Sequence, residues 1–402
     1  MSREELFKNI AVQNDRKIVL VVLDGLGGLP VAGLSELETA KTPNLDSLAA
    51  RSELGLSHPV GIGITPGSGP AHLSLFGYDP LRYDIGRGIL EALGIGVEVG
   101  AGEVTCRGNF ATISDGLVSD RRAGRISSER NSEIIVFLKD KIKEIDGVKI
   151  SLYSGEEHRF VLVLQGQGLD DRIADVDPGI VGKPVPDAAA EFESGHKTAR
   201  VVNEFVVRAR DLLASFHPVN GVLLRGFAKS PDIPSMAELF KLRPAAIATY
   251  PMYRGLARLV GMTVLPTGKT MAAEIETLRQ HYGDFDFFFL HVKKTDSWGE
   301  DGNFDAKVKV IEEFDTLLPE ITALNPDVLV VTGDHSTPAQ LAGHSWHPNP
   351  VLLHSPFVRP KPEASAGFGE SACAVGTLGF FQAVDLMPLM LANALKLKKY
   401  GA

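Results

Sequence analysis

The sequence has little of what marks a secreted or membrane protein. Cysteine occurs only as Cys106 and Cys373, far apart and outside any Cys-x-x-Cys pattern, so we expect two free, buried thiols in a reducing cytoplasm. No uninterrupted apolar run approaches the roughly 18 residues of a spanning helix. Residues 1–17 lack the apolar stretch of a signal peptide. We therefore predict a cytoplasmic protein that is neither secreted nor inserted in a membrane.

Positive charge is also in short supply. The 41 Lys and Arg residues are outnumbered by 50 Asp and Glu, and the net charge of −9 argues against a broad nucleic-acid surface. We expect a small-molecule ligand and no nucleic-acid partner, and composition leaves the oligomeric state open. At 402 residues the chain exceeds the roughly 250–300 at which one hydrophobic core stops growing, which favours two domains.

What is present is a recurring pattern of short apolar runs, typical of buried strands in a parallel sheet, at residues 17–23, 245–249, 286–292 and 327–331. Helical stretches at 41–52, 271–282 and 306–318 accompany them. Between about 95 and 225 the pattern changes to short alternating stretches interrupted by Gly and Pro. We predict an α/β, doubly wound core formed by residues 1–95 and 226–402, with a smaller α+β domain inserted at 96–225.

One serine stands out in ITPGSGPAHLSLFGYDP, residues 64–80, where Ser68 lies between two glycines. We predict a tight, exposed turn followed by a helix that begins near Ala71. Flanking glycines let the backbone approach a ligand, and a helix start directs N–H groups toward an anion. An ordinary Gly- and Pro-rich loop is the structural alternative.

Polar side chains follow three of the predicted strands. Asp24 comes directly after the first strand. The third strand runs into polar residues within the segment 287–301. Asp334-His335 follows the fourth strand, with His344 nine residues further on. Because open α/β sheets bind ligands at the carboxyl ends of their strands, this pattern predicts metal binding. A structural aspartate that caps a turn is the alternative for Asp24.

Basic residues gather within the predicted insertion. Arg121, Arg122 and Arg125 lie in DRRAGRIS, residues 120–127, and Arg159 follows later beside a histidine. Arginines at this spacing can converge on one phosphate or carboxylate, whereas a solvated basic turn is the alternative.

Together these motifs resemble the archaeal-type cofactor-independent phosphoglycerate mutases, a branch of the alkaline phosphatase superfamily. The resemblance rests, in order along the chain, on VVLDGLGG (21–28), KTPNLD (41–46), PGSGPAHLSLFGYDP (66–80), DRRAGRI (120–126), HVKKTD (291–296) and TGDHSTP (332–338). It implies an alkaline-phosphatase-like core. It also implies interconversion of 3-phosphoglycerate and 2-phosphoglycerate in glycolysis and gluconeogenesis, through a phosphoserine and without 2,3-bisphosphoglycerate or any organic cofactor.

The resemblance also implies roles for residues of this chain. It implies that Ser68 accepts the phosphoryl group and binds one of two divalent cations. Mn²⁺ is the expected metal, and Mg²⁺, Co²⁺ and Zn²⁺ are the alternatives. The ligands implied for that first cation are Ser68, Asp24, Asp334 and His335, and those for the second are Asp296 and His344. The implied substrate contacts are Asp120, Arg121 and Arg125, with Arg159 and Arg254 as weaker candidates.

One position departs from the family. The family has His four residues after the aspartate that corresponds to Asp296, whereas this chain has Glu300. Because carboxylates favour harder cations than imidazoles do, we predict Glu300 as a metal ligand that shifts metal preference. His291 and His347 are the alternatives.

The family chemistry requires water to be kept from the phosphoserine, which predicts a lid function for the inserted domain, with hinges near residues 90–96 and 225–245. If water enters, the enzyme becomes a phosphatase, so a metal-dependent phosphatase or phosphonate hydrolase on the same scaffold is the alternative function. A non-enzymatic phosphate- or metal-binding protein would need no nucleophile. A nucleotide-binding enzyme is disfavoured because no G-x-G-x-x-G follows the first strand.

Overall fold

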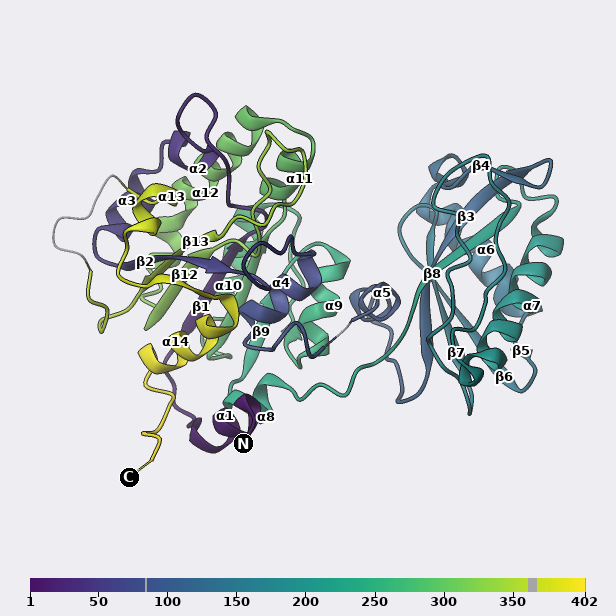
Figure 1. The fold of residues 1–402 in the computed structure, drawn as a ribbon, viewed down its shortest axis with the longest axis horizontal. Coiled ribbons are helices and arrows are strands. Elements are labelled where there is room, and N and C mark those ends of the chain that lie inside the picture. Colours follow the sequence, from purple (N-terminus) through teal and green to yellow (C-terminus); the bar gives the residue numbers. More distant parts are fainter. Residues whose placement is uncertain (84, 361–366, 402) are drawn as a thin grey trace. The chain divides into compact units, whose positions relative to one another are not determined.

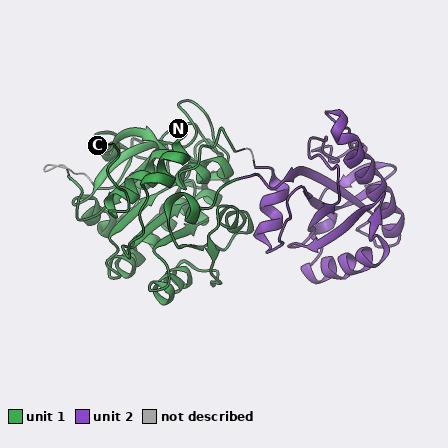
Figure 2. Cartoon of the chain, turned by 90° about the horizontal axis from the view of Figure 1, so that it is seen from below, with its two compact units in different colours: residues 1–84, 233–402 green, residues 85–232 purple. Residues whose placement is uncertain are grey.

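The computed structural model describes residues 1–83, 85–360 and 367–401. The chain divides into two compact units, drawn in different colours in Figure 2. Unit 1 comprises Met1–Asp84 and Ile233–Ala402, and unit 2 comprises Ile85–Asp232. Unit 2 is therefore an insertion in the sequence of unit 1, and the segment predicted as an inserted domain falls within it.

Unit 1 is built on an eight-stranded sheet with the order β10-β9-β11-β1-β12-β13-β2-β14. Strand β13 is antiparallel to both of its neighbours, and the other described pairs are parallel. The predicted α/β class is confirmed, with one reversed strand that the sequence did not indicate. The strands are β1 Ile18–Leu23, β2 Glu53–His58, β9 Pro244–Ile247, β10 Thr263–Val264, β11 Phe287–Val292, β12 Val328–Thr332, β13 Asn349–His354 and β14 Gly379–Gln382.

The middle of this sheet consists of three parallel strands, β11, β1 and β12, of which Figure 1 labels β1 and β12. Every residue of these strands is buried. Burial on both faces explains why the strands are continuous apolar runs, and why they were predictable. Their carboxyl ends, at Leu23, Val292 and Thr332, lie at the same edge of the sheet.

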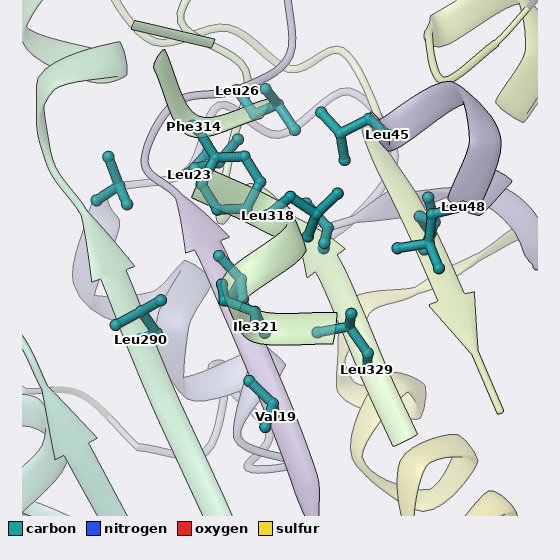
Figure 3. Close-up of a cluster of buried hydrophobic side chains, with 14 of the residues drawn as sticks. Val19, Leu23, Leu26, Leu45, Leu48, Leu290, Phe314, Leu318, Ile321 and Leu329 are labelled. Atoms are coloured by element: carbon teal, nitrogen blue, oxygen red, sulfur yellow. The ribbon is translucent and has the colours of Figure 1, made fainter. Parts of the chain in front are cut away.

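Helices surround the sheet of unit 1: α1 Arg3–Ile10, α2 Glu36–Thr39, α3 Pro43–Ala49, α4 Ser68–Leu75, α8 Met236–Phe240, α9 Pro251–Leu259, α10 Met271–His281, α11 Lys294–Glu300, α12 Phe304–Thr322, α13 Glu370–Ala374 and α14 Leu386–Asn393. Helix α12 packs its apolar side on the central strands, as the close-up in Figure 3 shows for Phe314, Leu318 and Ile321. Each fully buried side chain of this size contributes about 1.5–3 kcal/mol, so this cluster fixes the strands beneath the site.

Helix α4 begins earlier than the sequence suggested. Its first residue is Ser68, not a residue near Ala71. Gly67 adopts an extended backbone and forms the N-cap, and its carbonyl accepts the N–H of Ala71 at 3.2 Å. Pro70 does not interrupt the helix because a proline in the first turn lacks only an N–H that would have no partner within the helix.

Unit 2 is an α+β domain in which the described strand pairs are all antiparallel. Its sheet has the order β4-β3-β7-β6-β5, with β8 also paired to β3. The strands are β3 Val104–Ser114, β4 Leu117–Asp120, β5 Glu144–Ile145, β6 Val148–Ser154, β7 Arg159–Gln165 and β8 Gly221–Lys229, and the helices are α5 Arg87–Gly94, α6 Ser128–Lys141 and α7 His196–Leu213. Across the described ranges of both units, no helix is long and apolar enough to cross a membrane.

Candidate functional site

The site in unit 1 starts from Ser68 at the first position of α4. The N–H groups of its first turn have no partner within the helix, and no side chain caps them. The half-buried Ser68 places its Oγ 3.3 Å from Nε2 of His335. The hydroxyl therefore lies beside the polar residues that follow β12.

A first group of metal-binding side chains comes from adjacent strand ends. Asp24 follows β1, and Asp334 and His335 follow β12; all three are buried, and one ligand atom of each lies within 4.8 Å of the others. Oδ1 of Asp24 and Oδ2 of Asp334 are buried without a hydrogen-bond partner. Asp334 Oδ2 has ion-pair contacts with the imidazoles of His72 and His335, each 3.1 Å away. Buried carboxylate oxygens without a hydrogen bond are costly, and oxygen and imidazole donors at this spacing suit a divalent cation. The residues present therefore fit the metal that the motifs predicted.

A second group lies beside the first and shares a residue with it. Asp296, His335 and His344 also bring ligand atoms within 4.8 Å of one another. Nε2 of His344 is 3.5 Å from Oδ1 of Asp296, and the rings of His335 and His344 stack with centroids 3.7 Å apart. Nδ1 of His344 lies 2.9 Å from the carbonyl of Pro66, which only accepts, so Nδ1 carries a proton and Nε2 is the nitrogen that faces the second group.

Glu300 stands at the rim of the second group. It ends helix α11, its side chain is 54% exposed, and Oε1 lies 3.8 Å from Nε2 of His344. Partial burial, together with the nearby Asp296 carboxylate, raises the pKa of Glu300. The Glu300 side chain therefore lies outside this group. It would have to move inward to bind the same cation.

Lys293 offsets part of the negative charge of the two metal-binding groups. Its Nζ lies 3.0 Å from Oδ2 of Asp24 and 2.5 Å from Oδ2 of Asp296. Burial opposes the charged ammonium, but the two carboxylates outweigh it and raise the pKa of Lys293. For Asp24, burial is outweighed in turn by His291 and Lys293, which hold the pKa of this carboxyl well below its usual range.

The two alternative histidines lie in different places. His291 is fully buried, with Nε2 3.3 Å from Oδ2 of Asp24 and its ring stacked on Tyr253. The Tyr253 hydroxyl donates to the same Asp24 oxygen at 2.5 Å. His347 instead places Nδ1 3.1 Å from Oγ of Ser345 and stacks on Trp346. Of the two, only His291 touches a residue of the metal-binding groups.

Unit 2 contains a separate basic cavity of about 310 Å³. It is lined by Arg107, Asn109, Arg121, Arg122, Arg125, Glu157, His158, Arg159 and Arg225. Arg121 makes a two-pronged contact with the carboxylate of Asp177 at 2.8–3.1 Å. Burial, followed by the neighbouring Arg159, lowers the pKa of His158 to about 4. At neutral pH the cavity therefore holds six guanidinium groups, the side chain of Glu157 and an uncharged imidazole, and this excess of positive charge suits an anion.

The sequence analysis did not predict two of the arginines that line this cavity. Arg107 on β3 and Arg225 on β8 are 118 positions apart but are direct partners in the sheet. Like charges that face each other across strands are destabilising, and the carboxylate of Asp177, 4.0 Å from Nε of Arg225, offsets part of this repulsion. Only knowledge of the strand register brings the two together.

The remaining predicted contacts divide between the units. In unit 2 the carboxylate of Asp120 accepts the N–H groups of Arg122 and Gly124, at 2.8 and 2.7 Å. Asp120 thereby shapes the turn that carries the arginines, and it does not line the cavity. Arg254 lies on α9 in unit 1, half-buried.

Comparison with known proteins gives one consistent result. The family described as 2,3-bisphosphoglycerate-independent phosphoglycerate mutase matches residues 49–220. A Thermotoga neapolitana protein named "probable 2,3-bisphosphoglycerate-independent phosphoglycerate mutase" is 54% identical over 100% of both chains. A Thermus thermophilus protein of the same name is 52% identical over 99% of each.

Two solved structures are also similar. A Pyrococcus horikoshii protein has a TM-score of 0.82 and 29% identity, over 97% of this chain and 100% of its own. A cofactor-independent phosphoglycerate mutase from Thermoplasma acidophilum has a TM-score of 0.72 and 31% identity, over 94% and 100%.

The fold and site define an α/β protein that gathers a serine hydroxyl and two groups of metal-binding side chains at one edge of a sheet. Identity above 50% along the whole chain makes the assignment specific. The chain belongs to the 2,3-bisphosphoglycerate-independent phosphoglycerate mutase family.

Proposed function

We propose that this protein interconverts 3-phosphoglycerate and 2-phosphoglycerate through a phosphoserine on Ser68, without 2,3-bisphosphoglycerate. The observation that carries the proposal is the position of the Ser68 hydroxyl, 3.3 Å from His335, which belongs to both metal-binding groups. The names of the full-length relatives support the same activity.

The reaction consists of two phosphoryl transfers. When bound, two divalent cations would activate the Ser68 hydroxyl and offset charge on the phosphoryl group. Ser68 Oγ gives up its proton and attacks phosphorus as the bond to the 3-oxygen breaks, and that oxygen takes up a proton. The 2-hydroxyl of the retained glycerate then loses its proton and attacks phosphorus, the bond to Oγ breaks, and Oγ regains a proton.

We propose Asp24, Asp334, His335 and Ser68 as ligands of one cation, and Asp296, His344 and Glu300 as ligands of the other. Mn²⁺ is the proposed metal, because these groups are rich in carboxylate oxygen and contain no thiolate. Lys293 contacts Asp24 and Asp296 and would keep their carboxylates oriented during turnover.

Glu300→His is expected to shift preference from Mn²⁺ toward Zn²⁺ by roughly tenfold, because imidazole is the softer ligand. Competition between the two ions for metal-stripped protein, followed by the electron paramagnetic resonance of free Mn²⁺, measures the ratio. Glu320→His on the exposed side of α12 is the matched control. An unchanged ratio in Glu300→His would exclude residue 300 from the ligand set.

The second part of the proposal concerns unit 2. We propose that its arginine cavity binds the carboxylate and phosphate of the substrate, and that unit 2 acts as a lid that keeps water from the phosphoserine. Substrate and Mn²⁺ should then change the small-angle scattering profile, and an unchanged profile would count against closure.

Arg159→Gln is expected to raise KM for 3-phosphoglycerate by about 10- to 100-fold, because a hydrogen bond to a charged group contributes about 1.5–3 kcal/mol. Steady-state kinetics at saturating Mn²⁺ measures the change. Arg200→Gln is the control, because Arg200 pairs with Asp146 at the surface of unit 2, outside the cavity. Equal KM values for the two variants would remove Arg159 from the substrate site.

Phosphorus NMR tests the function as a whole. Metal-stripped protein is given 3-phosphoglycerate with and without Mn²⁺, and with no 2,3-bisphosphoglycerate. Growth of the 2-phosphoglycerate signal only with metal is the expected result. Growth of inorganic phosphate in its place would identify a phosphatase on this scaffold.

The proposed substrate is a small metabolite, and we propose a cytoplasmic location. Two observations are in keeping with this: Cys106 and Cys373 are buried, free thiols, as the sequence predicted, and the net charge is −9.

A further inference from the structure

The hydroxyl of Thr337 links the two metal-binding groups. Its Oγ1 donates to Oδ1 of Asp296 at 2.7 Å and lies 3.0 Å from Nδ1 of His335. Asp296 belongs to one group and His335 to both. Thr337 itself follows His335 by two residues, and its side chain is directed back between the two ligands.

The chemistry of these three groups determines where the protons lie. A carboxylate only accepts hydrogen bonds, so the single hydroxyl proton of Thr337 is directed to Asp296. The hydroxyl oxygen is then an acceptor toward His335, and Nδ1 of His335 must carry a proton to donate to it. A neutral imidazole has one N–H, so Nε2 of His335 keeps its lone pair.

That lone pair points into the space where the proposed first cation would bind. Nε2 of His335 is 3.1 Å from Oδ2 of Asp334, 3.5 Å from Oδ1 of Asp24 and 3.3 Å from Oγ of Ser68. The opposite tautomer would direct an N–H into the space that these oxygens surround, and could not bind a cation there. One threonine hydroxyl thus selects the tautomer of one ligand and orients another.

Thr337 is held rigidly enough to do this. It is fully buried, its N–H donates to the carbonyl of Gly27 at 3.0 Å, and its carbonyl accepts Nζ of Lys307 at 2.9 Å. A Cβ added to Gly25, whose φ is +64°, would lie 2.5 Å from the Thr337 hydroxyl oxygen. The absence of a side chain at Gly25 therefore leaves the space that the hydroxyl occupies.

We propose that Thr337 is a positioning residue for both metal-binding groups, which it couples by fixing the Nδ1–H tautomer of His335 and the orientation of Asp296. The inference rests on the proposed metal-dependent function but concerns metal binding, not turnover. Residues with this relation to a ligand typically contribute 10- to 100-fold to metal affinity.

The first test uses the wild-type protein without metal. Nitrogen-15 NMR of protein labelled at its histidines, with His335 assigned by the signal that His335→Gln removes, reports which ring nitrogen bears the proton. A proton on Nδ1 is the expected result, and a proton on Nε2 would overturn the proposal. This test does not require a variant of Thr337 to fold.

The second test measures Mn²⁺ affinity by calorimetry in three variants. Thr337→Val keeps the shape but removes the hydroxyl, and should weaken binding by about 10- to 100-fold. Thr337→Ser keeps the hydroxyl and should restore it. Thr277→Val, which removes a buried hydroxyl bonded to the Ala273 carbonyl on α10, is the control and should bind as wild type.

Each other outcome counts against the proposal. Wild-type affinity in Thr337→Val would show that the hydroxyl does not matter. A failure of Thr337→Ser to restore affinity would assign the loss to packing. Because neither measurement involves phosphoglycerate, the proposal on Thr337 and the proposed mutase activity can fail separately.

Discussion

Ser68→Ala is expected to lower mutase turnover by roughly 10⁴-fold or more, because Ser68 is the proposed phosphoryl acceptor and reactions lose most of their acceleration without the nucleophile. Binding of Mn²⁺ should persist, since Asp24, Asp334 and His335 would still hold the proposed first cation without the serine. Coupled spectrophotometric assay of 2-phosphoglycerate measures the first effect, and calorimetry the second.

The matched control is Ser74→Ala. Ser74 lies on the same helix α4 and is fully buried, and its hydroxyl is outside both metal-binding groups. The same atom is removed from the same helix, so turnover should stay near wild type. Substantial turnover in Ser68→Ala would rule out the phosphoserine route and require direct transfer between substrate oxygens.

Lys307→Met is expected to lower the free energy of unfolding by about 3–5 kcal/mol, because it removes one partner of a buried charge pair. The fully buried Lys307 donates to the carbonyls of Gly27 and Thr337, at 3.0 and 2.9 Å, and lies 3.7 Å from Oε1 of Glu36. Burial lowers the pKa of Lys307, so its charge depends on these partners. Its contacts also tie the segment after β1 to the segment after β12.

Urea unfolding measures the effect on unit 1. Lys309→Met, an exposed lysine on the same helix α12, should change the free energy of unfolding by less than about 0.5 kcal/mol. The double variant Glu36→Gln with Lys307→Met should recover part of the loss, since it leaves no unpaired charge. A Lys307→Met protein as stable as wild type would show that the Lys307–Glu36 pair makes no net contribution to stability.

The parts of the fold that sequence could predict are those with a local signal. Strands β1, β11 and β12 are buried on both faces, so each is a continuous apolar run, and each ends in a polar motif. Because parallel strands end at one edge, the strand assignment predicted that Asp24, Asp334 and the polar cluster at 287–301 lie together, and the family resemblance singled out Asp296 in that cluster.

Features that depend on pairing between distant segments had no such signal. The sequence of the reversed strand β13 contains no signal for its direction. Arg107 and Arg225 become neighbours only through the register of β3 and β8. Thr337 lay inside a predicted motif, but its role depends on the direction of its side chain. The start of α4 was misplaced because the sequence does not reveal that Gly67 is its N-cap.

The position of β1 between β11 and β12 has a consequence for synthesis on the ribosome. About 260 residues, including all of unit 2, are made between Leu23 of β1 and Phe287 of β11, the first of its two partners. At roughly 5–20 residues per second, β1 waits about 13–52 s with both edges unpaired. An exposed IVLVVL segment is prone to aggregate during that time, whereas unit 2 is contiguous and can fold as it emerges. Asp24 is thus among the first residues of the site to be made, and its strand is among the last to find its neighbours.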